Sequence, residues 1–349
     1  MEFRTAFTPV VVATGVCFAS LILWQLWPEM PQASAAAAPV TEGAHDRAGE
    51  SVAAIRPIPA ATGLDLRKVA LGRRLFQERR LSRNDTISCA TCHGLSTAGV
   101  DGLPQSIGIG RRVGTRNAPT VFNACLNYRQ FWDGRAATLE EQIDGPLQAR
   151  SEMSSDWQEV TQKLGCDAGY KRAFLSLYPE GIQPRTIKDA IATFERSLVT
   201  PDAPFDAYLR GDVHAISAQA REGYRLFTDY GCVACHQGGN VGGNLMQPFG
   251  VMLDPAAIRN ASQRGGRLLR LSDIEAGASH GHGELYRVPS LRNVARTAPY
   301  FHNGSEKTLS GAIQMMGMSQ LGRRLTDPDV TAIQAFLKSL TGRYEGKSL

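Results

Sequence analysis

The sequence predicts a mainly α-helical protein built from two similar small domains. Three observations lead to this fold class. The string Cys-x-x-Cys-His occurs twice, as Cys89–His93 and Cys232–His236, once in each half of the 349 residues. A similar stretch precedes each copy, Gly72–Phe76 and Gly223–Phe227, and each resembles the end of an amphipathic helix. The length also suits about two domains, so the chain is expected to contain a duplication separated by loop insertions.

The repeated string is the attachment signal for c-type haem. Two thiols on one turn can reach both haem vinyl groups, and the adjacent imidazole then serves as the proximal iron ligand. Zinc sites and redox dithiols also use Cys-x-x-Cys, but they do not need the following His. The sequence therefore predicts two covalently bound haem c groups, attached through the residues Cys89, Cys92, His93, Cys232, Cys235 and His236.

Helical periodicity supports the predicted fold class. Thr186–Leu198 has an apolar stripe with a period of 3.6 residues and is ended by Pro201, and Asp327–Leu340 repeats the pattern. Long glycine-rich connections, Gly94–Gly114 and Gly238–Gly250, separate the helical stretches. Loops of this length are uncommon in compact domains unless they serve a function, and such loops commonly wrap the edge of a cofactor.

The N-terminus indicates export. Arg4 precedes an uncharged, largely apolar stretch from Thr5 to Pro28, and Ala33–Ala35 fits a signal cleavage site. The apolar stretch also approaches the length that spans a bilayer, so residues 1–35 are interpreted as either a signal peptide or a membrane anchor. Because haem is attached to Cys outside the bacterial cytoplasm, we expect a periplasmic protein, either soluble after cleavage or tethered to the inner membrane.

Composition suggests where the domains begin. Residues 36–60 are rich in Ala and Pro and are expected to form a flexible linker. The two haem domains are then predicted at 61–203 and 204–349. The spare cysteines Cys125 and Cys166 could form a disulfide or remain buried thiols. The formal net charge of +5 is spread along the chain, which indicates no nucleic-acid partner.

The second axial ligand of each haem separates a catalyst from an electron carrier. No His lies between His93 and His214, so the first haem is expected to be five-coordinate with an open face. Met153 is the other sulfur candidate there, although a Met in such a setting usually packs in a core. Met315–Met318, which follows a predicted helical stretch from Leu309, can supply a thioether to the second haem.

Several further motifs in this order resemble the bacterial dihaem cytochrome c peroxidase family, over about residues 65–342. The matching segments are Asn117–Thr120, Phe131–Ala136, Leu139–Gln142, Glu152–Met153, Phe194–Glu195, Leu198–Pro201, Val288–Asn293 and Pro299–Gly304.

The resemblance implies two cytochrome c-like helical domains with different roles. The haem at Cys89 would be peroxidatic, and the haem at Cys232 would transfer electrons, with Met316 as its second iron ligand. Trp132 matches the tryptophan that lies between the haems. Arg292, in the matching segment Val288–Asn293, is expected to contact a haem.

The family also implies catalytic and calcium-binding residues. Glu152 matches the acid/base residue above the open haem face, with Gln142 nearby. Asn117 and the carbonyls of Thr297 and Pro299 match a calcium site between the domains, and oxygen ligands of this kind suit Ca²⁺.

One departure from the family pattern is informative. Many members have a His in the Ser106–Gly108 loop that covers the peroxidatic iron in the oxidised state, whereas Ile109 occupies that position here. An Ile cannot ligate iron, so the site is expected to be open without reductive activation. A sister group, the enzymes that mature methylamine dehydrogenase, also lacks this His and oxidises side chains of a partner protein. That group has a Tyr at the position of Met316.

The predicted activity is therefore reduction of hydrogen peroxide to water. A small periplasmic redox protein, either a cytochrome c or a cupredoxin, would supply the electrons, and the resemblance implies a homodimer. The alternative is a peroxide-dependent dihaem oxidase that modifies a partner protein. A pure electron carrier would need a ligand such as Met153 on the first haem.

Overall fold

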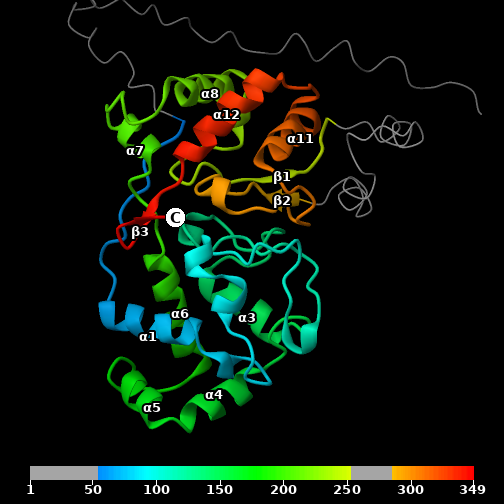
Figure 1. Cartoon of the computed structure of the whole chain (residues 1–349). Helices are drawn as coiled ribbons and strands as arrows, with labels where there is room; N and C mark the ends of the chain where they lie inside the picture. The colour runs from blue at the N-terminus through cyan, green and yellow to red at the C-terminus, as the bar shows by residue number, and fades with distance from the viewer. Residues whose placement is uncertain (1–53, 253–284) are drawn as a thin grey trace, which may run out of the picture. The chain divides into compact units, whose positions relative to one another are not determined.

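A computed structural model describes residues 54–252 and 285–349, and this part of the chain is mainly helical (Figure 1). The predicted signal or anchor and most of the predicted linker lie outside these residues. Within the described ranges, no helix combines the length and the apolar character needed to cross a bilayer.

Helices supply the regular structure of the first half. They are α1 (Leu66–Phe76), α2 (Cys89–Cys92), α3 (Leu139–Gln148), α4 (Trp157–Gly165), α5 (Ala168–Leu175) and α6 (Pro184–Ser197). The second half contains α7 (Pro204–Leu209), α8 (Ala218–Asp229), α11 (Leu309–Leu321) and α12 (Asp327–Ser339). Two small antiparallel pairs join β1 (Met246–Pro248) to β2 (Leu285–Arg287) and β3 (Arg343–Tyr344) to β4 (Lys347–Ser348).

The predicted helices are confirmed with small shifts at their ends. Helix α6 begins at Pro184 rather than Thr186, because proline suits the first turn of a helix, where no backbone donor is required. Helix α12 covers all but the last residue of Asp327–Leu340. The Gly72–Phe76 stretch ends α1, whereas α8 continues two residues beyond Phe227.

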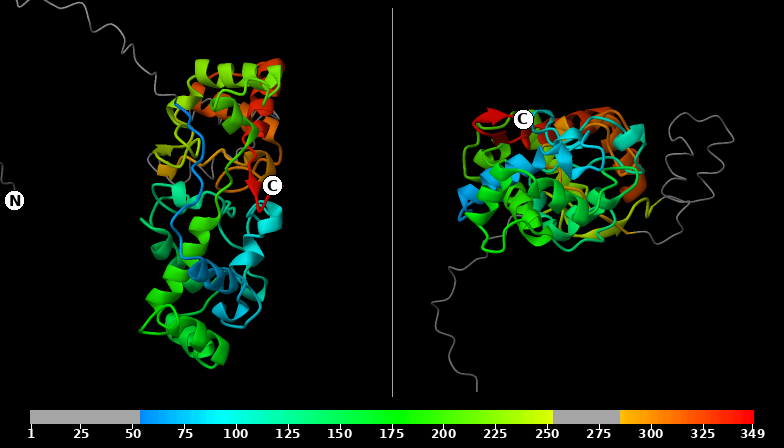
Figure 2. Two further views of the ribbon diagram at one scale, coloured as in Figure 1. Left: turned by 90° about the vertical axis from the view of Figure 1, so that its left-hand side faces the viewer. Right: turned by 90° about the horizontal axis from the view of Figure 1, so that it is seen from below.

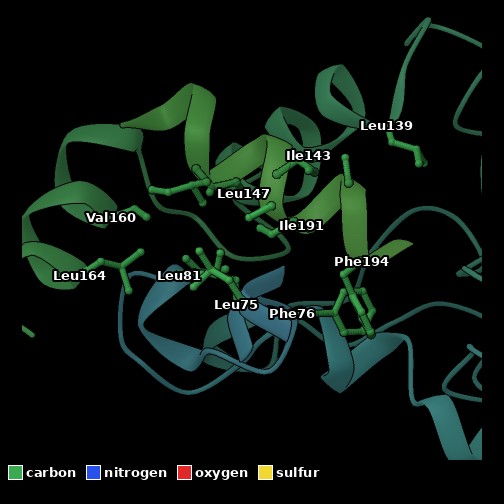
Figure 3. Packing of buried hydrophobic residues seen from close by; sticks show 14 of the residues in the cluster. Leu75, Phe76, Leu81, Leu139, Ile143, Leu147, Val160, Leu164, Ile191 and Phe194 are labelled. Atoms are coloured by element: carbon green, nitrogen blue, oxygen red, sulfur yellow. The ribbon is translucent and has the colours of Figure 1, made fainter. Parts of the chain in front are cut away.

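The first half has its own hydrophobic core, in which α1 packs against α6 (Figure 3). Phe76 and Phe194 meet edge to face, with ring centroids 5.3 Å apart. Gly72 allows the close approach, since a Cβ there would lie 1.9 Å from the carbonyl oxygen of Ala190. Leu147 and Met153 extend this core toward α3.

The second half repeats this arrangement with α8 beside α12 (Figures 1 and 2). Gly223 takes the place of Gly72, because a Cβ at Gly223 would lie 1.9 Å from the carbonyl oxygen of Ala332. The repeat seen in the sequence therefore marks the contact between two helices in each half.

The end of the predicted linker is not flexible. Ile55 is fully buried in the core of the second half, and Ile58 is also buried. The Arg56 carbonyl accepts a hydrogen bond from Arg292 Nη2 at 2.9 Å. From there the chain runs to α1 in the first half (Figure 1). The linker prediction is thus wrong for these residues, because two isoleucines can bury apolar surface that an Ala/Pro count does not reveal.

The loops that follow the two haem motifs form a second internal repeat. Asn123 and Asn293 both adopt left-handed backbone, with φ of 61° and 62°. At the same spacing, Phe131 and Phe301 have φ of 67° and 71°. Each loop then enters a helix through a threonine N-cap, Thr138 for α3 and Thr308 for α11. Two isolated antiparallel bridges also correspond, Gln130 to Ala136 and Tyr300 to Glu306.

The two asparagines of this repeat meet at one hydroxyl. Asn123 Nδ2 and Asn293 Nδ2 both donate to Thr200 Oγ1, at 2.8 and 3.0 Å. Their backbone N–H groups donate to the carbonyls that end α6 and α12, those of Leu198 and Leu340. All three polar side chains are buried, so the network satisfies groups that would be costly to leave unpaired.

No disulfide joins Cys125 and Cys166 in the described structure. Cys125 is half-buried beside the first core, whereas Cys166 is exposed at the end of α4. Of the two alternatives left open by the sequence, the structure has the unpaired thiols, but Cys166 is exposed rather than buried.

Replacing Gly223 with Ala should lower the free energy of unfolding of the haem-loaded protein by roughly 1–3 kcal/mol, because the new methyl group separates α8 from α12. Chemical denaturation measures the change. Gly165→Ala is the matched control, since a Cβ at this helical glycine meets nothing within 4 Å. Equal stability of both variants would contradict the packing described above.

Candidate functional site

The first haem motif forms a single helical turn that carries both thiols. Cys89 and Cys92 begin and end α2, and His93 follows as its C-cap. The Nδ1 atom of His93 donates to the Gly99 carbonyl at 3.1 Å, which leaves Nε2 as the metal-binding atom. Burial lowers the pKa of His93, so the ring is held in the neutral form that ligates iron.

A buried carboxyl lies near the first motif. Burial raises the pKa of the Cys89 thiol to about 12, and the charge of Glu195 contributes to the same shift. Glu195 itself has a pKa raised to about 8, first by burial and then by Glu140. Glu195 belongs to the Phe194–Glu195 segment of the sequence pattern. The interaction with Cys89 shows that Glu195 lies near the haem-attachment residues. The neighbouring Arg196 is more exposed and pairs with Glu140.

The second haem motif follows α8 and forms a 3-10 turn, Cys232–Ala234. Burial lowers the pKa of His236 to about 4, so this imidazole is also neutral. The backbones of Val241 and Pro289 lie near the ring and oppose this shift. His236 Nδ1 makes no hydrogen bond of ordinary geometry within the described residues.

Helix α11 carries the predicted thioether ligand, Met316. Apolar residues occur on every side of this helix, a pattern typical of a helix that is covered all round. Yet Met315, Met316 and Met318 are each only half-buried by protein atoms. The uncovered apolar surface suits a helix that contacts a large apolar group such as haem.

Glu152 lies against the loop that contains Ile109. The Ile109 N–H donates to the Glu152 carbonyl at 2.9 Å. Gly108 permits this contact, because a Cβ there would lie 2.0 Å from the Ser151 carbonyl oxygen. Desolvation raises the pKa of the Glu152 carboxyl although the residue as a whole is exposed, and Arg135 opposes the shift.

The surroundings of Glu152 connect it to the first haem motif. Burial raises the pKa of Cys92, and the charge of Glu152 acts in the same direction. Gln142 lies on α3. The chain after α3 folds back onto that helix, where the Met153 N–H donates to the Pro146 carbonyl. Within the described residues, no hydrogen bond joins Gln142 to Glu152. Met153 is buried in the first core, so its role is packing.

The residues predicted for the domain junction do come together. A cavity of about 90 Å³ is lined by Trp132, Asn117, Thr297 and Pro299. Trp132 Nε1 donates to the Asn117 carbonyl at 2.9 Å. The side-chain nitrogen of Asn117 donates to the Leu103 carbonyl, which leaves the side-chain oxygen as the atom that could bind a cation.

Arg292 is fully buried and has partners within the protein. Its Nη2 lies 2.8 Å from Asp206 Oδ1, and its Nε donates to the Gly239 carbonyl at 2.9 Å. Nη1 alone has no partner in the described structure. A structural role for Arg292 is thus visible, and its predicted haem contact depends on this one remaining nitrogen.

Sequence reasoning missed an aromatic cluster at the junction. His302 stacks on Tyr286 with ring centroids 4.4 Å apart, and Trp132 meets His302 edge to face at 6.4 Å. In the sequence, His302 stands out only as part of the matching segment Pro299–Gly304. Its position in the loop repeat, equivalent to that of Trp132, is the signal that could have placed it here.

The residues present fit two haem groups. Each motif offers two unpaired thiols and a buried neutral imidazole, which is the donor set that covalent haem requires. By contrast, no group of three or more His, Cys, Asp or Glu side chains in the described ranges forms a metal site without haem.

Two family models match the chain. The model described as di-haem cytochrome c peroxidase matches residues 66–214, and the model described as cytochrome c matches residues 220–341. These two matches agree with one haem c in each half.

Three relatives show the range of similarity. The chain is 46% identical to cytochrome c peroxidase of Escherichia coli K12 over 83% of its length, although the match spans only 61% of that relative. It is 45% identical to cytochrome c551 peroxidase of Pseudomonas aeruginosa, over 78% of each chain. Identity falls to 34% with methylamine utilization protein MauG of Methylorubrum extorquens, over 74% of this chain and 70% of that one.

A solved structure supports the same assignment. A MauG-like protein associated with microbial copper homeostasis is 28% identical, with a TM-score of 0.66 over 84% of this chain and 95% of that one. The two haem motifs, their buried imidazoles and these similarities lead to one conclusion. This chain is a member of the di-haem cytochrome c peroxidase family.

Proposed function

We propose that this chain reduces hydrogen peroxide to water, using two electrons and two protons for each peroxide. The observation that carries the proposal is the position of Glu152. Its carboxyl lies near the first haem motif, beside a loop that presents Ile109 rather than a ligating side chain. Bound haem would supply the redox-active iron, and the chain would supply the proton-transfer group.

Glu152 is proposed to move the proton. Peroxide cleavage needs a base that takes a proton from one oxygen and an acid that returns it to the leaving oxygen. Desolvation raises the pKa of the Glu152 carboxyl, and this direction of shift favours a group that must both take up and release a proton. Gln142, on the nearby helix α3, is proposed to help orient the peroxide by hydrogen bonding.

Two residues support an open face on the first haem. Ile109 is buried and carries no donor atom. The loop repeat pairs Met316 of α11 with Pro146 of α3, because both helices start from equivalent threonine caps. A proline has no side-chain donor, so the position that offers a thioether in the second half offers none in the first. The site is therefore proposed to be open without reductive activation.

The second haem is proposed to pass electrons to the first. Met316 as its axial ligand would raise the reduction potential and so favour acceptance of electrons from a donor protein. Trp132 lies at the junction cavity between the halves, in contact with His302. This position supports the proposal that its indole shortens the electron path.

Further assignments belong to the same proposal. A calcium ion would bind the Asn117 side-chain oxygen and the carbonyls of Thr297 and Pro299, with water completing the shell. The donor would be a small periplasmic cytochrome c or cupredoxin, and the enzyme would act as a homodimer. It would be soluble after signal cleavage or tethered to the inner membrane. Arg292 would contact haem through Nη1.

The alternative, oxidation of side chains on a partner protein, draws support from Ile109, since the sister group also lacks the capping His. Met316 favours the peroxidase, because that group has a Tyr there. Peroxide turnover with a small electron donor alone, in the absence of any partner protein, separates the two functions.

Electron paramagnetic resonance of the fully oxidised protein at low temperature is the first test. An open first haem and a Met-ligated second haem should give one high-spin and one low-spin ferric signal. Two low-spin signals would mean that a side chain closes the first iron, and the proposal of a constitutively open site would fail.

Glu152→Gln should lower kcat for peroxide by about 10²- to 10⁴-fold, because an amide cannot transfer the proton. Wild-type activity should also fall as the pH drops through the raised pKa of Glu152, since the base form is lost, and the variant should lack this limb. Steady-state kinetics at several pH values measures both effects. Glu222→Gln, at an exposed residue of α8, is the control. Unchanged turnover in E152Q with normal haem content would remove Glu152 from the mechanism.

Met316→His should lower the reduction potential of the second haem, because an imidazole stabilises ferric iron more than a thioether does. Spectroelectrochemical titration measures the potential, and Met318→Leu on the same helix is the control. If M316H leaves the potential unchanged, another residue is the ligand.

A further inference from the structure

Arg287 is a buried cation without an acidic partner. Its residue is 4% exposed, and it lies at the end of β2, at the junction cavity. The Nε atom donates to the Phe131 carbonyl at 3.3 Å, which leaves both terminal nitrogens for other partners. No carboxylate among the described residues pairs with it, in contrast to Arg292 with Asp206. Burial correspondingly lowers the pKa of Arg287 to about 10, with no opposing charge.

The loop repeat explains why Arg287 occupies this place. Its backbone N–H donates to the Trp132 carbonyl at 2.7 Å, and the backbone N–H of Asn117 donates to the His302 carbonyl at 2.9 Å. Asn117 corresponds to Arg287 in the repeat, and Trp132 corresponds to His302. The junction is therefore held by two equivalent hydrogen bonds, and the side chains of Asn117 and Arg287 enter the same cavity from equivalent positions.

The cavity is also bounded by the backbone that surrounds both iron-ligating histidines. Pro119 lies near His93, and Pro289, its counterpart in the repeat, lies near His236. Both prolines line the cavity. A group that extends from the edge of either haem would thus have a short route to the guanidinium of Arg287.

A buried guanidinium without a counter-ion is strongly disfavoured. The anions that the proposed cofactors bring are the haem propionates, and Arg pairs well with carboxylates through two parallel hydrogen bonds. We propose that Arg287 binds a haem propionate at the junction cavity and thereby raises the reduction potential of that haem. This role rests on the haem attachment proposed above. At the position where the loop of the first half has the neutral Asn117, the loop of the second half would then have a cation, Arg287.

The test compares the reduction potentials of haem-loaded wild type, Arg287→Gln, Arg287→Lys and Arg296→Gln. A positive charge near haem favours the ferrous state, so R287Q should shift the Fe³⁺/Fe²⁺ equilibrium of one haem toward Fe³⁺ by about tenfold, or about 59 mV. R287K should stay close to wild type. Arg296 is exposed in the same loop, so R296Q should change neither potential.

The outcomes separate this role from the others. Potentials in R287Q that match those of wild type, at full haem content, would overturn the proposal. If R287Q loses haem, R287K decides, since wild-type potentials support the role of the charge and lowered potentials contradict it. A wild-type potential that varies with phosphate concentration would mean that a soluble anion, not a propionate, lies against Arg287. The titration needs no peroxide turnover, so loss of peroxidase activity alone would count only against the proposed function.

Discussion

The hydroxyl of Thr200 is the point on which the arrangement of the two halves depends. It accepts hydrogen bonds from Asn123 and from Asn293, one from each haem-bearing half. The backbone N–H of each asparagine also donates to the carbonyl at the C-terminal end of a helix in its own half. The acceptor is Leu198 for Asn123 and Leu340 for Asn293. Because these groups are buried, loss of one partner would leave a desolvated amide without compensation. The network thus connects the core of each half to the loop that faces the other.

The repeated loop serves a different site in each half of the protein. The repeat places Trp132 in contact with His302, and it places Asn117 and Arg287 around one cavity. Two equivalent backbone hydrogen bonds hold the two loops together. Beyond the loops, Pro146 and Met316 occupy equivalent turns of α3 and α11. A shared backbone therefore presents side chains of different chemistry at equivalent positions, as the proposed open first haem and Met-ligated second haem require.

Local patterns made much of this protein predictable. The haem motifs depend on contiguous residues, so their thiols and imidazoles were identified without a fold. The helices of Thr186–Leu198 and Asp327–Leu340 follow from periodicity and proline positions. Ile55 was misassigned because its burial depends on the distant core of the second half. The pairing of Tyr286 with His302 was missed because Tyr286 has no local signal, and His302 can be placed only through its equivalence to Trp132 in the loop repeat.

The sequence alone determined the cofactor class, the helical character and the family, because each is encoded by short motifs and by periodic burial. Folding in three dimensions decided which polar groups remain unpaired. Whether Arg287 meets a carboxylate, whether Met153 packs or binds iron, and whether the Glu152 carbonyl bonds to Ile109 all depend on contacts between segments far apart in the chain. The energy of a buried charge or thioether is set by those neighbours, and no local pattern contains them.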